Sequence, residues 1–419
     1  MSRRSRLPRF ISRRGFLALT ASVLLPQRTL DISHFPPTGM FRGNPLRTGF
    51  YDAADVPTHA TLEEFYRGGH KIVASPLIAD DLVCVGHCTA RNLALTSRRP
   101  HPFVALDLRT GRPRWTFLAD SDIVSSAARY GDTLLVGSLD GRLNALDLDG
   151  TRKWTFQAEG GIFGSPAVDD GYAVFASGDM GLGRLYCLDI RRRRLRWPPV
   201  EMPAGPFASP CIAAGNIFVG TYWDTKKDSH LYVVDLHSGQ RRRVATMHMA
   251  CYCATPASDG QTVYIADCGE WARKSIFYAF DAATAEELWR LELDADNVAS
   301  SPSLVGHLAI FGCDRGTLMA VNTAERRLEW RTACQARAFH ASPIATPGAI
   351  YIGSTRGNLH VFDHAGQLLR QYRAGSEIES TAAIRDGQLF FGTAGGRLFR
   401  LAAPATQPRS PGPTLRESS

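Results

Sequence analysis

A short element, Ser-Pro or a close variant of it, recurs eight times along the chain and constrains the fold more than any other feature. The second residue of the element is Pro in six copies and Ala in two: Pro76, Ala127, Pro166, Pro210, Pro256, Pro302, Pro343 and Ala382. Successive copies are 51, 39, 44, 46, 46, 41 and 39 residues apart. A period of this size predicts a repeat fold with one four-stranded blade per unit.

The unit from Leu134 to Trp154 shows the pattern inside each repeat. Two apolar or alternating runs flank Asp140-Gly141, which is a hairpin signal, and a second turn leads into a strand that carries Trp154. An Asp before this second turn can accept hydrogen bonds from the turn amides. It recurs as Asp107, Asp147, Asp189, Asp235, Asp281 and Asp363, with Asn322 in one unit. Seven or eight residues later comes Trp115, Trp154, Trp197, Trp289 or Trp330, with Arg243 and Arg370 in two units.

The first and last repeats complete each other. The eighth unit, 377–402, ends before its Trp strand, whereas residues 61–67 precede the first Ser-Pro element and carry Phe65 in the Trp position. This arrangement closes a ring and removes exposed sheet edges. No segment has sustained helical periodicity. We therefore predict an all-β fold, an eight-bladed β-propeller over residues 61–402 whose ring is closed by an N-terminal strand.

The N-terminal residues predict export. Ser12 to Leu17 (SRRGFL) follows a basic region and opens an apolar run, Gly15 to Leu25, that is too short to span a bilayer. We interpret residues 1–30 as a twin-arginine-like signal segment, residues 31–60 as a Pro-rich lead-in and residues 403–419 as a disordered tail. The predicted location is the periplasm, as a soluble protein. A basic tail with a chance arginine pair is the alternative.

The net charge does not point to nucleic acid. Seven of the arginines lie in residues 1–30, which contain no acid, so the remainder carries only +1 of the total +8. No basic excess is left on the predicted propeller as a whole, and we expect no nucleic-acid partner.

The repeat pattern resembles the PQQ-type, or quinoprotein-like, propeller repeat. The similarity is clearest in Leu134 to Trp154, Tyr351 to Phe362 and Phe390 to Leu401, and Phe41 to Gly49 resembles the lead-in of such proteins. The resemblance implies the fold and two functions: quinone-dependent alcohol dehydrogenases, and propeller lipoproteins that assist outer-membrane protein assembly. Fold alone does not choose between these functions.

The residues match neither function completely. The dehydrogenases have a pair of adjacent cysteines over the quinone PQQ, whereas the nearest feature here is Cys251-Tyr252-Cys253, and the calcium ligands of that family cannot be placed. The lipoproteins carry a lipid-attachment cysteine that is absent after the apolar run. We therefore expect a periplasmic binding or assembly module, with a PQQ-dependent or metal-dependent oxidoreductase as the alternative.

One face of the predicted ring takes nearly all of the length variation. The insertions lie between the second and third strands of four units, at 88–102, 179–184, 222–230 and 268–275. Loops clustered over a rigid scaffold favour binding, so we predict a protein partner or small-molecule ligand here, although tolerated insertions also drift to such places. The residues assigned to this face are Lys71, Asn297, Glu377, Trp223 and Trp271.

Polar residues just before the Ser-Pro elements converge on the same mouth of the ring. Among them, Asp122, His340 and Glu379 are the candidate catalytic residues if the protein is an enzyme. A hydrated mouth without a ligand is the alternative. We find no standard catalytic motif in the sequence, so the enzyme class stays open.

The nine cysteines divide into two groups. Cys84, Cys187, Cys211 and Cys313 fall where other units have Val, Ala or Ser, so we expect them in the core. The fifth unit gathers His248, Cys251, Cys253 and Cys268, a set suited to a soft metal such as copper or zinc. A disulfide from Cys268 to Cys251 or Cys253, or unpaired thiols, remain equally open.

The opposite face is rich in arginine. The last turns of four consecutive units carry Arg109, Arg112 and Arg114; Arg152 and Lys153; Arg191 to Arg194 with Arg196; and Arg241 to Arg243. This pattern is typical of a solvated surface. It also fits docking to an anionic membrane surface or to an acidic partner, in which case binding would weaken with salt.

Overall fold

We describe the structure from a computed structural model of the chain. It describes residues 39–404, except residues 53–54, 58, 90–98, 180, 204, 206–207, 222–228, 248–253, 268–273, 295–297 and 299. The predicted signal segment and residues 405–419 of the predicted tail lie outside this range.

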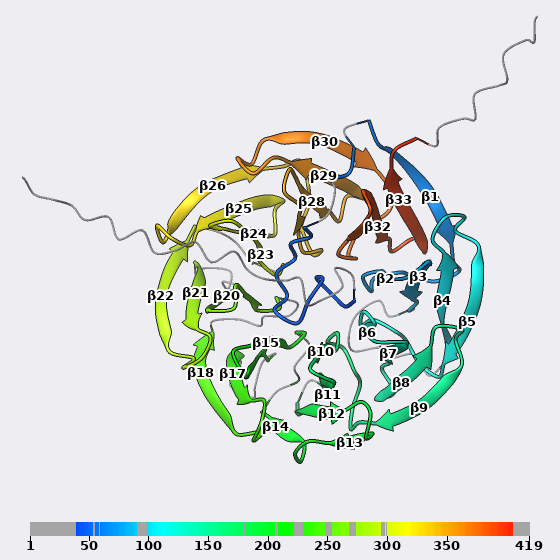
Figure 1. Cartoon of the computed structure of the whole chain (residues 1–419). Helices are drawn as coiled ribbons and strands as arrows, with labels where there is room; N and C mark the ends of the chain where they lie inside the picture. The colour runs from blue at the N-terminus through cyan, green and yellow to red at the C-terminus, as the bar shows by residue number, and fades with distance from the viewer. Residues whose placement is uncertain are drawn as a thin grey trace, which may run out of the picture. The chain divides into compact units, whose positions relative to one another are not determined.

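Residues 61–402 form eight antiparallel sheets arranged as the blades of a ring, which confirms the predicted eight-bladed β-propeller (Figure 1). The first strands lie nearest the axis: β2 (Leu77–Ala79), β6 (Ala128–Tyr130), β10 (Ala167–Asp169), β15 (Cys211–Ala213), β19 (Ala257–Ser258), β23 (Ser303–Val305), β27 (Ile344–Ala345) and β31 (Ala383–Arg385). The second strands are β3 (Leu82–Gly86), β7 (Thr133–Gly137), β11 (Tyr172–Gly178), β16 (Asn216–Gly220), β20 (Thr262–Ala266), β24 (Leu308–Gly312), β28 (Ile350–Gly353) and β32 (Gln388–Gly392).

The third and fourth strands complete each blade. The third strands are β4 (His101–Asp107), β8 (Arg142–Asp147), β12 (Gly183–Asp189), β17 (Ser229–Asp235), β21 (Ser275–Asp281), β25 (Thr317–Asn322), β29 (Asn358–Phe362) and β33 (Arg397–Ala402). The fourth are β5 (Pro113–Ala119), β9 (Arg152–Gln157), β13 (Arg194–Leu195) with β14 (Val200–Met202), β18 (Arg241–Met247), β22 (Glu287–Leu293), β26 (Arg327–Ala333), β30 (Leu368–Arg373) and β1 (Thr61–Arg67). In the described part of the chain, no helix is long and apolar enough to cross a membrane.

The ring closes as the sequence predicts. Strand β1 pairs antiparallel with β33, from Thr61 opposite Ala402 to Arg67 opposite Arg397. Phe65 takes the Trp position. Its side chain packs against a buried cluster that includes Val104 and Leu106 of the next blade, and its ring lies 3.3 Å from where a Cβ atom would be at Gly111. The first and last elements of the fold therefore form one blade.

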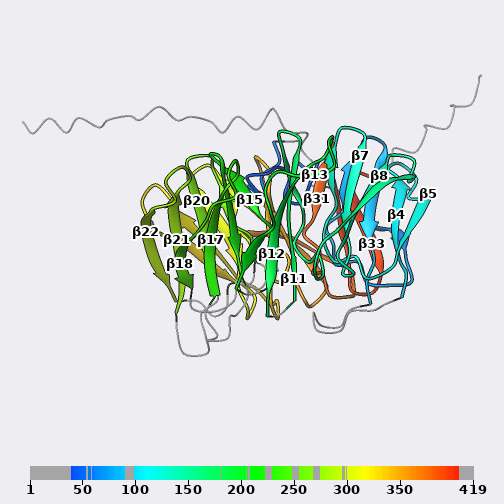
Figure 2. The same cartoon turned by 90° about the horizontal axis from the view of Figure 1, so that it is seen from below.

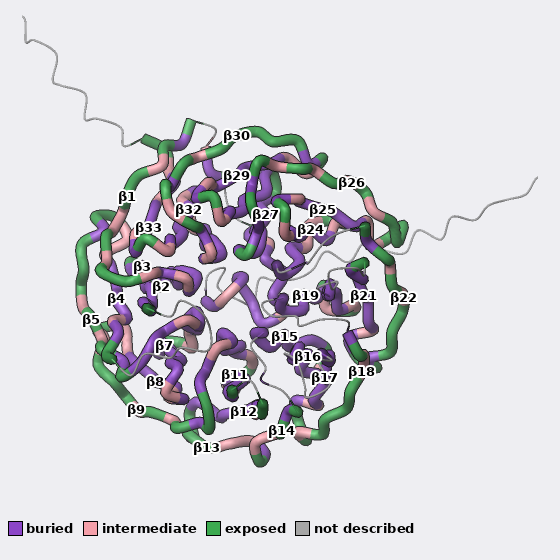
Figure 3. The backbone as a smooth tube through the Cα atoms, turned by 180° about the vertical axis from the view of Figure 1, so that it is seen from behind, coloured by how far each residue is buried: buried purple, intermediate pink, exposed green. Residues whose placement is uncertain are grey.

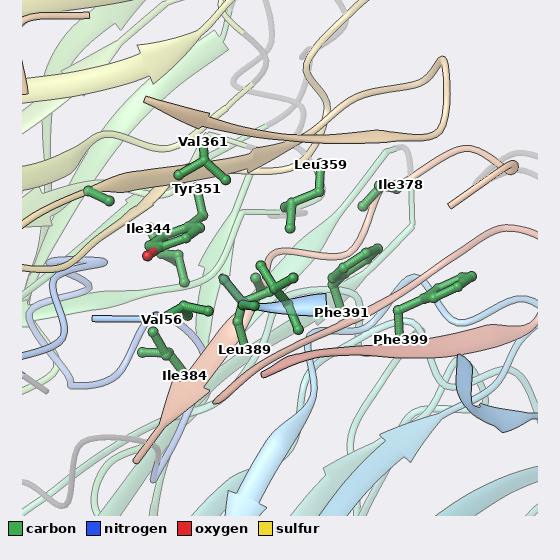
Figure 4. Close-up of a cluster of buried hydrophobic side chains, with 14 of the residues drawn as sticks. Val56, Ile344, Tyr351, Leu359, Val361, Ile378, Ile384, Leu389, Phe391 and Phe399 are labelled. Atoms are coloured by element: carbon green, nitrogen blue, oxygen red, sulfur yellow. The ribbon is translucent and has the colours of Figure 1, made fainter. Parts of the chain in front are cut away.

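The core lies between neighbouring blades. Strands one to three are mostly buried, whereas the fourth strands are exposed on alternate residues along the rim (Figure 3). In the cluster between the seventh and eighth blades, Tyr351 and Leu359 face Leu389 and Phe391 (Figure 4). Each sheet buries one face on each neighbour, so a blade is stable only within the ring. Cys84, Cys187, Cys211 and Cys313 are buried in these layers, as expected.

The Ser-Pro element has a structural explanation. Each copy directly precedes a first strand, and from the second copy to the eighth its Ser or Thr hydroxyl accepts a hydrogen bond from the equivalent backbone N–H of the preceding blade. Seven consecutive links run from Ser75 to Thr381 at 2.9–3.2 Å: Ser75–Ser126, Ser126–Ser165, Ser165–Ser209, Ser209–Thr255, Thr255–Ser301, Ser301–Ser342 and Ser342–Thr381. The repeated hydroxyl thus joins blade to blade around the axis.

The repeated Asp and Trp act at the rim. Asp235 accepts hydrogen bonds from the N–H groups of His237 and Ser238, and the bonds from Ser238 lower the pKa of its carboxyl. Trp197 Nε1 donates to Leu236 O in the next blade at 3.2 Å, and its ring covers Gly239. Trp115 and Trp330 make the same contact with the turns that follow β8 and β29. The Asp shapes the turn, and the Trp of the preceding blade packs on it.

The lead-in forms part of the propeller core. The sequence shows residues 40–50 only as a turn segment, but they lie at the centre of the ring (Figure 1). Backbone N–H groups from four first strands donate to the lead-in: Ile212 to Pro45 O, Ser258 to Leu46 O, Leu304 to Thr48 O and Ala345 to Gly49 O, at 2.8–2.9 Å. Residues 39–51 therefore fill the axis at the level of the first strands.

Two buried arginines hold the lead-in in place. Arg47 donates to Pro210 O at 3.0 Å, Ser165 O at 2.9 Å and Phe41 O at 2.7 Å. Arg42 donates to Arg47 O at 3.0 Å and to Pro302 O. Burial lowers the pKa of Arg42 to about 9 and that of Arg47 to about 10. Backbone carbonyls surround both guanidinium groups, and these carbonyls belong to several different blades.

Candidate functional site

The two faces of the ring differ in what they carry. We call the face with the connections between second and third strands, and the links to the next blade, the link face. The turn face has the connections between first and second and between third and fourth strands. The link face is the lower side in Figure 2.

The four insertions belong to connections of the link face, and most of their residues lie outside the described part of the chain. They connect β3 to β4, β11 to β12, β16 to β17, and β20 to β21, in the first, third, fourth and fifth blades. Trp223, Trp271 and Asn297 lie outside the described residues, as do His248, Cys251, Cys253 and Cys268. The predicted metal or disulfide set therefore stays a prediction. Within the described part, no group of three or more His, Cys, Asp or Glu side chains is placed to hold a metal ion.

Asp122 contacts residues near both ends of the first insertion. Its carboxylate is fully buried in the link between the first and second blades. Oδ1 accepts a hydrogen bond from Thr89 N at 2.5 Å and lies 3.4 Å from His101 Nε2. The other ring nitrogen of His101 lies 2.8 Å from Arg99 O. Because Thr89 and Arg99 lie near the two ends of the insertion, the side chains of Asp122 and His101 hold both ends.

A second buried histidine lies in the same region. His87 Nδ1 is 3.1 Å from Pro102 O, and Nε2 has no hydrogen-bond partner in the described structure. Burial lowers the pKa of His87 to about 4, which keeps the ring neutral at physiological pH. A donating Nδ1–H leaves the lone pair of Nε2 directed at Gly68, where no side chain could fit. The buried His87 ring therefore packs beneath the first insertion and supports its ends.

The other predicted residues are spread around the link face. His340 is half-exposed in the link between the sixth and seventh blades, with Nε2 3.7 Å from Asp314 Oδ1. Glu377 and Glu379 belong to the next link, where Glu377 is exposed and its carbonyl accepts a hydrogen bond from Ala394 N. Lys71 lies in the link before β2 and bridges Cys88 through its backbone. The candidate catalytic residues thus come from three different links.

The turn face carries the predicted arginines, and they fall into two groups. In the first two blades Arg114 pairs with Asp81, and Lys153 pairs with Asp132 at 3.0 Å, whereas Arg109, Arg112 and Arg152 are exposed and form no ion pair with any described residue. In the neighbouring third and fourth blades Arg191 to Arg194 and Arg241 to Arg243 are all exposed, and of these Arg192 pairs with Asp189. The third and fourth blades therefore carry the larger group of exposed arginines on this face.

The sequence did not reveal the lead-in as the filling of the axis. Its contacts join Arg47 to Ser165 and Arg42 to Ser301, residues more than a hundred positions away, and it has no periodicity of its own. The signals in the sequence were its position before the first strand, the resemblance of Phe41 to Gly49 to the lead-in of PQQ-type propellers, and two arginines within a short turn segment.

Known proteins that resemble this chain share its propeller fold, and a family model matches its repeats. The family model described as outer membrane protein assembly factor BamB matches residues 85–162, 160–245 and 251–410, which is more than half of the chain. The protein of that name from Nitrosomonas eutropha is 28% identical over 120 residues, covering 28% of this chain and 29% of the relative. The one from Bordetella pertussis is 21% identical over 296 residues, covering 60% of this chain and 76% of the relative.

Known structures share the architecture at low identity. The crystal structure of BamB from Moraxella catarrhalis has a TM-score of 0.61 at 16% identity, covering 82% of this chain and 99% of that one. Quinohemoprotein alcohol dehydrogenase from Comamonas testosteroni has a TM-score of 0.66 at 13% identity, covering 91% and 83%. Such similarities show the fold alone. On the strength of the sequence match over its repeats, the chain belongs to the outer membrane protein assembly factor BamB family of PQQ-type propellers.

Proposed function

We propose that this protein is an exported periplasmic propeller that binds a protein partner through its link face and acts as an assembly module. The observation that carries the proposal is the asymmetry of the two faces. The lead-in fills the axis next to the first strands, and the insertions of four blades all emerge on the link face. The relatives named as assembly factors for outer membrane proteins support this kind of function.

The link face is built to present rigid loop ends. Asp122 and His101 fix both ends of the first insertion. On neighbouring blades, ion pairs join the link of one blade to the third strand of the next: Asp120 with Arg142, and Glu159 with Arg184. A rigid base lowers the entropy lost when the loops bind a partner.

The oxidoreductase alternative has less support. The dehydrogenases among the structural relatives share the fold at identities of 11–13%. Asp122 is engaged by Thr89 and His101, and His340 by Asp314, so the structure assigns each a local partner. We derive no step through PQQ or a metal, because the described donor residues do not form a ligand set.

Photo-crosslinking in cells tests the proposal. A crosslinking amino acid placed at His340 or Glu377 on the link face should give a discrete adduct with a periplasmic or outer-membrane protein. The same probe at Arg109 or Arg152 on the turn face is the matched control and should give none. Equal adducts from both faces, or adducts from the turn face alone, would contradict a partner site on the link face.

A further inference from the structure

Five exposed arginines on the turn face come from the neighbouring third and fourth blades. We call Arg191, Arg193, Arg194, Arg242 and Arg243 the arginine patch. Arg191 and Arg193 belong to the turn between β12 and β13, Arg194 begins β13, and Arg242 and Arg243 lie at the start of β18. Among the residues that the structure describes, no carboxylate lies within ion-pair distance of any of them, and Arg242 donates to the carbonyl of Thr284.

Two of the acidic groups near the patch are engaged by their own turns. Asp189 accepts from Arg192 at 2.9 Å, and Asp235 accepts hydrogen bonds from its own turn. Asp169 is half-buried, and Asp170 next to it is exposed but forms no ion pair with the patch within the described structure. The patch therefore keeps most of its positive charge facing solvent.

Aromatic rings hold the neighbouring arginines in place. Arg196 lies over the ring of Tyr172 at 4.3 Å from its centroid, and Arg241 over that of Tyr232 at 5.1 Å. Arg191 of the patch lies over Tyr130 at 5.7 Å. Cation–π contacts of this kind restrain long side chains, so less freedom is lost when they bind an anion.

The chemistry of the patch fits phosphate better than a protein surface. Guanidinium groups bind phosphate oxygens through two parallel hydrogen bonds. A stable protein interface normally needs buried aromatic or apolar anchors at its centre. The large exposed apolar residues of the described structure are Leu118, Leu182, Leu288, Leu368 and Leu369, and none belongs to the turns that carry the patch.

The described start of the chain contacts the same face. Gly39 O accepts a hydrogen bond from Arg129 N, near the end of β6, and Asp55 accepts from Gly348 N in the turn after β27. Both contacts are at the turn face.

We propose that the arginine patch docks the turn face on an anionic phospholipid membrane. The guanidinium groups bind the lipid phosphates. The link face then points away from the membrane and stays open to a partner. The proposal goes beyond the partner-binding function and does not depend on it, because it uses the opposite face.

Vesicle co-sedimentation of the full chain tests the docking. Vesicles of phosphatidylcholine alone are compared with vesicles that also contain phosphatidylglycerol, at low and at high salt. The seven arginines of residues 1–30 also favour phosphatidylglycerol, so the contribution of the patch is measured by comparing two variants that share this segment. The test variant is R193G/R194S/R243S, and the control R326G/R337S/R356S removes the same charge elsewhere. Arg193 and Arg326 both have positive φ, so the glycines match.

The expected result is binding that requires phosphatidylglycerol and weakens with salt. Each basic residue at such a surface contributes about fivefold in affinity, so the test variant should bind on the order of 100-fold more weakly than the control. Equal affinity of the two variants, or no dependence on phosphatidylglycerol, overturns the proposal. So does binding of the patch to an acidic peptide but not to the vesicles. Crosslinking from the link face would be unaffected by any of these outcomes.

Discussion

At the scale of single residues, the most unusual feature is a pair of buried arginines that have no carboxylate partner among the described residues. Arg42 and Arg47 are 1% and 0% exposed, and both are satisfied by backbone carbonyls from distant blades. A buried cation is costly unless its donors are all used. The guanidinium group suits this role because its five N–H groups point in fixed directions. The two side chains therefore connect blades rather than bind a ligand.

Replacing Arg47 with Met should destabilise the protein strongly. Met keeps much of the volume but removes the donors to Pro210 O, Ser165 O and Phe41 O. We expect the free energy of unfolding to fall by about 3–5 kcal/mol, measured by chemical denaturation. Arg47→Lys keeps the charge with fewer, differently placed donors and should fall between.

Arg152→Met is the control, because Arg152 is exposed on β9 and should change stability by less than about 0.5 kcal/mol. Equal stability of Arg47→Met and the wild type would show that the lead-in does not depend on this side chain. The sequence could not predict the contacts, since nothing in residues 40–50 indicates which carbonyls the arginines would meet.

At the scale of elements, the turn between the third and fourth strands of a blade packs against the Trp side chain of the preceding blade. Gly239 has φ +74°, and an added Cβ would lie 2.7 Å from Trp197 Cγ. The same geometry recurs at Gly150 against Trp115 and at Gly366 against Trp330, at 2.6 Å. The glycine is needed both for its backbone conformation and for the close approach of the indole.

Two glycines of the fourth blade separate these effects. Gly215 has φ +76° with no atom within 4 Å of an added Cβ, so Gly215→Ala should cost about 1 kcal/mol from backbone strain alone. Gly239→Ala should cost about 2 kcal/mol more, because Trp197 must move. Thermal denaturation of the two variants measures the difference. If both lose the same stability, the Trp contact does not determine the turn.

The strands could be predicted because the same sequence pattern recurs from one repeat to the next. Hairpin signals, the turn Asp and the Trp position recur with a fixed spacing, and the missing strand of the last unit appears at residues 61–67. The hydroxyl links between Ser75, Ser126 and their equivalents were not predicted, although the repeated Ser was their signal. The repeated Ser shows that the position matters, but the sequence of one repeat does not show that its hydroxyl bonds to the backbone of another repeat.

At the scale of the whole propeller, three kinds of contact join the blades. The β1–β33 pairing closes the ring at the rim, the hydroxyl links join successive blades from the first to the eighth, and the lead-in contacts the first strands at the axis. The candidate site was less predictable than the fold, since residues such as Asp122 and His340 come from links that the repeat leaves variable. Their local partners, Thr89 and Asp314, could be identified only in the folded ring.

The lead-in should be required for a cooperative ring. A chain that begins at Asp55 lacks the acceptors for four first-strand amides, those of Ile212, Ser258, Leu304 and Ala345. Each buried amide without a partner costs about 1–3 kcal/mol, a sum comparable to the net stability of a domain unless water enters the axis. We expect hydrogen exchange of these amides to accelerate sharply relative to a chain that begins at Gly39, while the outer strands keep their protection. A peptide of residues 39–52 added to the shorter chain should restore the protection, because the lead-in binds through its own carbonyls and arginines. Unchanged protection in the shorter chain would show that the first strands hold together without it.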